Sequence, residues 1–241
     1  MSFNFSKTLT PRDRLIFPLD LHTRKEARQF IALLAEVVGF FKVGLELYSA
    51  EGPRIIKLIQ RDAPNSGIFL DLKLHDIPAT VARTMDIIKG LGVDMVTVHA
   101  LGGVEMLQAA TEKSGSTKVL AVTLLTSLSP QSLPELKTSY RARGALTELL
   151  AKRALSAGCH GLVASSQEVS LLREISGPNS LLVIPGIRPS WATLPGDDQK
   201  RVGTPLQAIQ DGADFLVVGR PIRDAVDPFK AAQKIVAEIA S

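Results

Sequence analysis

The chain has very little cysteine: Cys159 is the only one among 241 residues. A disulfide framework within the chain and a CxxC metal knuckle are therefore excluded. Long apolar runs are missing too. No stretch reaches the roughly 20 residues that span a bilayer, and residues 1–10 lack the apolar core of a secretory signal. We accordingly expect a protein that has no membrane partner and works in the reducing cytoplasm.

Clustered positive charge is absent as well, although the formal net charge is +4 and the isoelectric point is about 9.3. Lysine and arginine are scattered among aspartate and glutamate, without the basic patch of a nucleic-acid-binding protein. A basic protein of this kind suits small anions such as phosphate esters. The motifs GxGxxG, Walker A, HExxH and GxSxG are missing, and the four histidines lack metal-ligand spacing. We therefore expect no cofactor, no metal and no nucleic-acid partner.

What the sequence does contain is a regular alternation of short apolar runs and longer amphipathic stretches. The runs are rich in Val, Ile, Leu and Phe, which is typical of strands buried on both faces. Thr23 with Glu26 matches a capping box, and Pro78 and Pro205 suit first helical positions. The expected strands are residues 15–21, 40–45, 68–74, 95–99, 119–124, 161–164, 181–185 and 215–218. The expected helices are residues 23–37, 53–60, 78–91, 103–112, 144–157, 167–175, 204–211 and 225–240.

A weak internal repeat indicates how these elements are joined. Gly92, Gly158 and Gly212 each stand between an expected helix and an expected strand. Glycine can end a helix in the left-handed conformation, and recurrent helix-glycine-strand joints predict parallel strands with helical crossovers. Eight such units favour one (β/α)8 barrel, a TIM barrel, that forms a single domain over residues 1–241. An open, doubly wound sheet is the alternative.

Charged residues gather where the expected strands end, which is where barrels of this kind carry their active sites. Asp71 and Lys73 are two apart, so they share a strand face with Phe69 that should point inward. Charges inside an apolar barrel are costly unless they are paired. The pair is either a structural ion pair that closes the mouth or a catalytic pair. Asp20 and Lys42 on neighbouring strands favour the second, because alternating charges would hold a protonated lysine ready to donate.

Gly219 and Arg220 follow the last strand and are a second indication of a ligand site at the mouth. The loops after strands seven and eight are the usual phosphate site of a barrel, and a forked arginine suits phosphate. The alternative is a glycine turn with a solvated arginine. We expect His99 to line the mouth and Cys159 to be buried. The connection of residues 186–203 should be mobile and should order over a bound phosphate ligand.

Beyond these patterns, residues 71–81 (DLKLHDIPATV) closely resemble the signature of orotidine 5'-phosphate decarboxylases. The similarity runs along nearly the whole chain, and one departure is Ala79, where many members carry asparagine. Segments that also resemble the family are residues 18–20 (PLD), 41–44 (FKVG), 122–127 (VTLLTS), 185–189 (PGIRP), 198–199 (DQ) and 218–220 (VGR).

The resemblance implies decarboxylation of orotidine 5'-phosphate to uridine 5'-phosphate without a cofactor, as the last step of pyrimidine nucleotide synthesis. Lys73 would protonate C6 and stabilise the developing carbanion, and Asp71 would lie near the substrate carboxylate. The resemblance also implies a homodimer in which Asp76 crosses into the partner's site. The other implied substrate contacts are Asp20 and Lys42 at the ribose, Thr80, Thr126 at the pyrimidine, and Arg188, Gln199, Gly219 and Arg220 at the phosphate.

Three rivals remain. A magnesium-dependent keto-sugar-phosphate decarboxylase or hexulose-phosphate synthase would use the aspartates on a metal, but residues 75–78 and Gln199 argue against it. A Schiff-base mechanism needs a neutral Lys73, whereas flanking Asp71 and Asp76 favour the ammonium. A non-catalytic phosphate-binding protein would have no need of the Asp71 and Lys73 pair.

Overall fold

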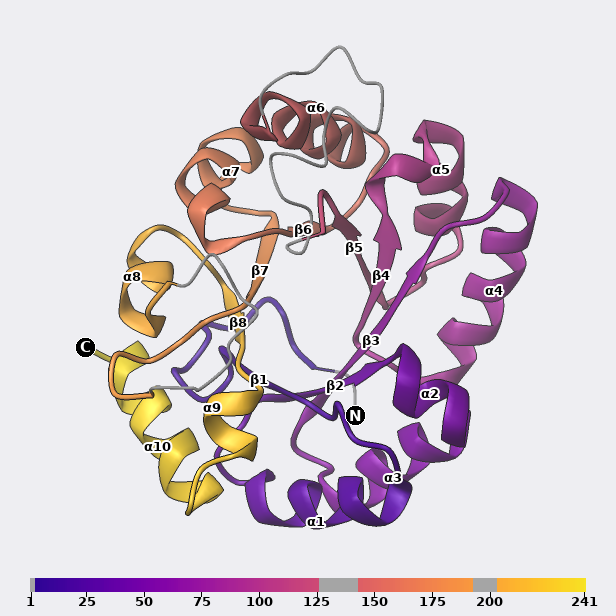
Figure 1. Ribbon diagram of the computed structural model, residues 1–241. Coiled ribbons are helices and arrows are strands. Elements are labelled where there is room, and N and C mark those ends of the chain that lie inside the picture. Colours follow the sequence, from indigo (N-terminus) through magenta and orange to yellow (C-terminus); the bar gives the residue numbers. More distant parts are fainter. Residues whose placement is uncertain (1–2, 126–142, 193–202) are drawn as a thin grey trace.

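The computed structural model describes residues 3–125, 143–192 and 203–241. Within these ranges eight parallel strands close into a barrel in chain order, ringed by helices (Figure 1). The last strand pairs with the first through Leu15 beside Leu216 and Ile16 beside Val217. This closure confirms the predicted TIM barrel, and the open sheet is wrong. The strands are β1 Leu15–Pro18, β2 Phe40–Gly44, β3 Gly67–Leu74, β4 Met95–His99, β5 Lys118–Val122, β6 Gly161–Val163, β7 Leu181–Pro185 and β8 Phe215–Val217.

The start and end signals predicted for several helices are present. Thr23 and Glu26 form a capping box, and Pro78 opens its helix. Gly92 and Gly158 take positive φ angles of 68° and 88° before the strands that follow them. The helices are α1 Arg24–Leu34, α2 Leu45–Glu51, α3 Arg54–Asp62, α4 Pro78–Leu91, α5 Val104–Glu112, α6 Arg143–Ser156, α7 Val169–Ser176, α8 Pro205–Gln210, α9 Arg220–Arg223 and α10 Pro228–Ile239, with 3-10 turns at Ala100–Gly102 and Ser166–Glu168.

Three helix predictions and one strand prediction are wrong in part. The helix expected over residues 23–37 ends at Leu34, and the strand expected over residues 15–21 ends at Pro18. The helix expected over residues 225–240 begins only at Pro228, where the Asp227 side chain accepts a hydrogen bond from the backbone N–H of Lys230. A proline at the first helical position makes this the natural start. The stretch between β2 and β3 holds two helices, α2 and α3, where one was expected. That residues 1–241 form one domain stays a prediction.

The core has two layers on either side of the strands. Side chains alternate, so Phe40 points into the barrel whereas Phe41 points toward the helices, and both are fully buried. Phe3 and Phe5 pack against the inner layer, with the Phe3 ring 4.5 Å from that of Phe40. Aromatic rings therefore fill one end of the barrel, and the charged residues lie at the other.

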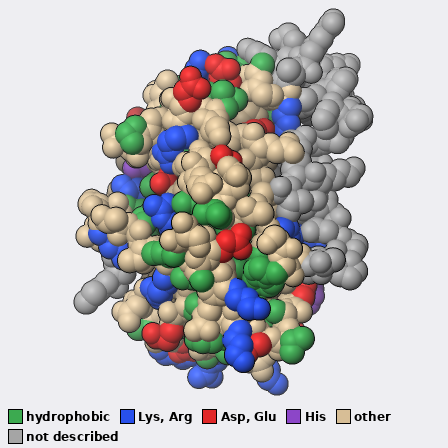
Figure 2. Space-filling model, turned by 90° about the vertical axis from the view of Figure 1, so that its left-hand side faces the viewer, with side chains coloured by type: hydrophobic (Ala, Val, Ile, Leu, Met, Phe, Trp, Pro, Cys, Tyr) green, Lys and Arg blue, Asp and Glu red, His purple; other side chains and the backbone are tan. Residues whose placement is uncertain are grey.

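The surface over the helices is mixed in charge. On the face that Figure 2 shows, basic and acidic side chains are interspersed among scattered apolar ones. In the described parts of the chain, none of the helices combines the length and apolar character needed to cross a membrane.

Candidate active site

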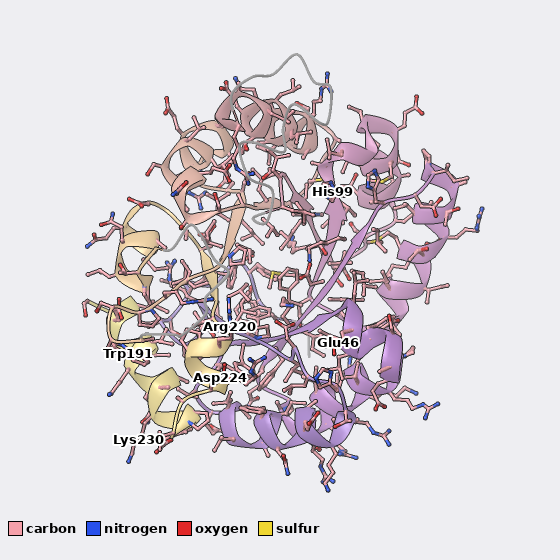
Figure 3. All side chains as sticks on the ribbon, viewed as in Figure 1. Glu46, His99, Trp191, Arg220, Asp224 and Lys230 are labelled. Atoms are coloured by element: carbon pink, nitrogen blue, oxygen red, sulfur yellow. The ribbon has the colours of Figure 1, made fainter. Side chains whose placement is uncertain are left out.

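A cavity of about 290 Å³ opens at the C-terminal ends of the strands. Most of the polar residues predicted for the site line it together, drawn from β1, β2, β3, β7 and β8 or the turns after them. Arg220 lies at this mouth, where α9 begins (Figure 3). The lining residues among those predicted are Asp20, Lys42, Asp71, Lys73, Arg188, Gly219 and Arg220.

The charged groups on one side of the cavity alternate in sign. Lys42 Nζ lies 3.1 Å from Asp20 Oδ1 and 3.5 Å from Asp71 Oδ2. Lys73 Nζ donates to both oxygens of Asp71, at 2.9 and 2.8 Å. The side chains of Lys42 and Asp71 are each 11% exposed, whereas that of Lys73 is 32% exposed. Lys73 is therefore the ammonium that is held by a buried carboxylate and yet faces the cavity.

The local backbone of β3 creates this arrangement. Leu70 pairs with Val96 and Leu74 pairs with Val98, so β3 advances four residues while β4 advances two. The extra residues form a bulge, and Lys73 within it has a φ of +50°. Lysine rarely adopts this left-handed conformation, because its Cβ crowds the backbone. No other residue except glycine has a positive φ in the described ranges.

The charge state of Asp71 follows from its neighbours. Burial raises its pKa, but the ammonium groups of Lys42 and Lys73 and hydrogen bonds from Lys73 and Thr97 lower it by more. The pKa of Asp71 therefore lies below its ordinary value, and its carboxylate is charged at neutral pH.

The part of the cavity that follows β7 and β8 carries arginines. Arg188 follows β7, and Arg220 and Arg223 lie on α9 after β8. At Gly219 an added Cβ would lie 3.0 Å from a Pro18 side-chain carbon. The chain can approach Pro18 this closely because glycine has no Cβ. Arg223 is a lining residue that the sequence analysis missed. It is paired with Asp224 at 2.6 Å, and this hydrogen bond helps to raise its pKa.

Apolar side chains complete the cavity between these two charged sides. They come from β3, β5, β6 and β8 and the residues just after β5. The strand alternation could have identified the inward-facing ones, because they share a face with the inner core. These lining residues are Phe69, Val122, Leu124, Leu125, Val163 and Val217.

Of the predicted catalytic and substrate-binding residues, two lie outside the cavity and two lie outside the described residues. His99, which was expected to line the mouth, is not among the lining residues either. Asp76 is exposed, and its Oδ1 accepts a 2.6 Å hydrogen bond from the N–H of Ile77. Thr80 stands in the first turn of α4. Neither lines the cavity of this single chain. Thr126 and Gln199 fall in the ranges that the structure does not describe, as does most of the connection of residues 186–203 that is expected to order over a ligand.

Two histidines stand beside Lys73. The rings of His75 and His99 stack with centroids 5.2 Å apart. His99 Nδ1 accepts a 3.4 Å hydrogen bond from the N–H of Leu101. Burial lowers the pKa of His99, and the charges of His75 and Lys73 lower it further. The neutral imidazole is therefore favoured at this edge of the mouth.

The residues described include no group of three or more His, Cys, Asp or Glu side chains arranged to hold a metal. The absence of a cofactor and of a metal stays a prediction. Cys159 is buried as expected, and burial raises the pKa of its thiol to about 12. A thiol with that pKa is a poor nucleophile at neutral pH.

This arrangement can donate a proton and stabilise negative charge. The Lys73 ammonium is fixed by Asp71 and faces a cavity with apolar walls, so it can protonate a carbanion formed there. Arg188 and Arg220 on the far side can bind a phosphate. The site therefore suits an anionic ligand that reacts at one end and is bound at the other.

Comparisons with known proteins agree with this chemistry. Residues 13–235 match the family described as "Orotidine 5'-phosphate decarboxylase / HUMPS family". The chain is 46% identical over 237 residues to the orotidine 5'-phosphate decarboxylase of Desulfosudis oleivorans, covering 97% of this chain and 95% of that one. It is 45% identical to that of Caulobacter sp. (strain K31), covering 94% and 97% of the two chains. The crystal structure of orotidine 5'-phosphate decarboxylase from Lactobacillus acidophilus superposes with a TM-score of 0.82 at 35% identity, covering 94% of this chain and 99% of that one.

Proposed function

Because the chain belongs to the orotidine 5'-phosphate decarboxylase / HUMPS family, we infer that the cavity at the barrel mouth is where it decarboxylates orotidine 5'-phosphate. The enzyme is a carboxy-lyase that forms uridine 5'-phosphate in pyrimidine biosynthesis. We also propose which side chains perform each step of the reaction. The observation that carries it is the Lys73 ammonium, which donates two hydrogen bonds to a buried Asp71 and is thereby held at the cavity.

Lys73 serves as the general acid. The bond between C6 of the pyrimidine and its carboxylate breaks, carbon dioxide leaves, and the electron pair stays on C6. An ammonium beside that carbon stabilises the developing charge and then transfers a proton from Nζ to C6. The neutral amine regains a proton from solvent, which its partial exposure permits. Asp71 orients the ammonium through both carboxylate oxygens.

The remaining predicted residues bind the nucleotide. Asp20 and Lys42 contact the ribose hydroxyls, a role supported by their place on the cavity wall, where Lys42 is paired with both Asp20 and Asp71. The phosphate lies opposite, where its binding energy is remote from the reacting carbon and can position the ring. The residues proposed for the phosphate are Arg188, Gln199, Gly219 and Arg220, with Thr126 at the pyrimidine and Thr80 as a further substrate contact.

We also propose a homodimer in which Asp76 completes the site of the partner subunit. Asp76 is exposed and lies outside the cavity of its own chain, directly after β3. Large apolar side chains are exposed on the segments that follow β3 and β4. Ile77 is 65% exposed, Ile87 66%, Leu101 44% and Val104 41%. Ile77, Leu101 and Val104 follow the strand ends at the mouth, whereas Ile87 lies further along α4, and together these side chains suit burial against a second copy.

A cytoplasmic location stays a proposal. Its support is the single, buried and unpaired cysteine, which suits a reducing compartment.

The direct test follows the loss of orotidine 5'-phosphate absorbance before and after exhaustive chelation. Full activity should survive chelation. The Lys73→Ala variant should fold and lose at least about a hundredfold in turnover, the smallest usual contribution of a general acid. Lys152→Ala, which removes an exposed lysine on α6, is the matched control and should keep wild-type turnover.

Two outcomes would count against the proposal. A Lys73→Ala variant with more than about a hundredth of wild-type turnover would exclude Lys73 as the general acid. Activity restored only by added magnesium would favour the sugar-phosphate rival, in which the aspartates hold a metal.

A further inference from the structure

We propose that Thr97 is a positioning residue that fixes the Lys73 ammonium against Asp71. Thr97 lies on β4, next to the bulge of β3, and is fully buried. It does not line the cavity, so it would act through its two neighbours rather than on the substrate. This inference rests on the proposed role of Lys73 as the proton donor.

The hydroxyl of Thr97 connects the backbone of Lys73 to the side chain of Asp71. Thr97 Oγ1 accepts a 2.8 Å hydrogen bond from the N–H of Lys73 and donates a 2.9 Å hydrogen bond to Asp71 Oδ1. A backbone N–H can only donate, so the hydroxyl must accept there and its single proton is left for Asp71. With the bonds from Lys73 Nζ back to Asp71, the three residues form a closed ring.

This ring of hydrogen bonds supplies two things that the bulge at Lys73 needs: an acceptor for its backbone N–H and contacts that hold its backbone in place. The bulge removes the Lys73 N–H from regular strand pairing with β4, so that N–H needs another acceptor. The left-handed backbone of Lys73 persists only where surrounding contacts hold it. Thr97 supplies the acceptor at the bulge, and it also holds the carboxylate on which the ammonium rests.

Packing alone does not explain a hydroxyl at this position. Thr97 shares the inward face of β4 with Met95, and valine has nearly the same shape as threonine. Valine would fill the space, but it would leave the Lys73 N–H without its acceptor and Asp71 without one donor. We therefore attribute the hydroxyl of Thr97 to its hydrogen bonds, which orient Asp71 and Lys73.

The test compares Thr97→Val, which removes the hydroxyl, with Thr97→Ser, which keeps it. In Thr97→Val we expect kcat to fall at least about tenfold, because a small misplacement of a catalytic group has a large effect on rate. KM should change less than about threefold, since the substrate contacts remain. Thr97→Ser should recover kcat to within about threefold of wild type. Thr117→Val is the matched control: Thr117 is also buried, but its hydroxyl donates to the carbonyl of Val93, away from the cavity.

The outcomes separate this inference from the proposed function. Equal kcat values for Thr97→Val and wild type, or equal losses in Thr97→Val and Thr97→Ser, would overturn the role of Thr97. If Thr97→Val does not fold, Thr97→Ser and Thr97→Ala still differ by the hydroxyl alone, and equal kcat values for those two would overturn it. Full activity in Lys73→Ala would instead overturn the proposed function, whatever the Thr97 variants do.

Discussion

Single residues around Lys73 show how charge is distributed at the mouth. Asp71 accepts hydrogen bonds from Lys73 and Thr97 and lies near Lys42, so its negative charge is compensated. His99 stacks on His75 near Lys73, and protonation of His99 would add positive charge there. Because burial and these neighbours lower the pKa of His99, the folded protein avoids a further cation beside the ammonium.

Stability should therefore depend on the protonation of His99. The unfolded histidine has a pKa of about 6.5, and the folded value is lower. Between the two values the unfolded chain binds more protons, so the free energy of unfolding falls as the pH drops from about 6.5 toward the folded value. Above 6.5 the stability is fully present. We expect the melting temperature of wild type to fall more than that of His99→Gln between about pH 7.5 and 5.5.

Thermal unfolding across that range measures the effect. His22→Gln, which removes an exposed imidazole, controls for the number of histidines. A parallel decline in wild type and His99→Gln would show that His99 carries none of this pH dependence.

Among the elements, β6 and β7 approach each other closely at Gly161. A Cβ added there would lie 2.2 Å from the backbone carbonyl oxygen of Leu181 on β7. Neither strand can move aside without disturbing its other neighbour in the barrel. Gly161→Ala should therefore lower the free energy of unfolding by at least about 2 kcal/mol, as expected for an overpacked core position.

Denaturant unfolding of Gly161→Ala against Gly144→Ala provides the comparison. A Cβ at Gly144 on α6 meets nothing within 4 Å, so alanine there should stabilise the protein by about 0.5–1 kcal/mol. Similar unfolding midpoints for the two variants would mean that the barrel relaxes around Gly161.

How well each element could be predicted depended on local signals. The bounds of α4 were predicted correctly because Pro78 and Gly92 mark its two ends. In contrast, α2 follows β2 at once, and its N-cap Gly44 makes no side-chain cap bond. The four-residue α9 is too short to show a helical repeat. Local chemistry therefore locates elements that are capped and separated, and misses those that follow a strand directly.

The site was predictable to the extent that it depends on strand ends. The strand-end rule brought Asp20, Lys42, Asp71 and Lys73 to one mouth, and the structure places them together. It could not show the bulge that turns Lys73, because register depends on pairing with β4. Thr97 was missed because it is neutral, although alternation with Met95 would have marked it as a polar residue on an inward face.

The whole molecule has two unlike barrel ends. Phe3 and Phe5 pack on Phe40 and Phe215 at one end, whereas the cavity and its charges occupy the other. Figure 1 shows α4 and α5 side by side at the edge of the barrel, following the strands that carry Asp71, Lys73 and Thr97. The exposed apolar side chains at the starts of these helices lie beyond that side of the mouth. A second copy packed there would bring its Asp76 toward this charged array.

A mixing experiment tests that arrangement. In a heterodimer of Lys73→Ala and Asp76→Asn chains, an Asp76 that crosses over leaves one site with both native residues and the other site with both defects. With random pairing, half of the dimers are mixed and each has one native site, so about a quarter of wild-type activity should return. Each parent should have almost none. If Asp76 acts in its own chain, every site in the heterodimer keeps one defect. Heterodimers that form, as native mass spectrometry would show, and yet have no activity above the parents would contradict the shared site.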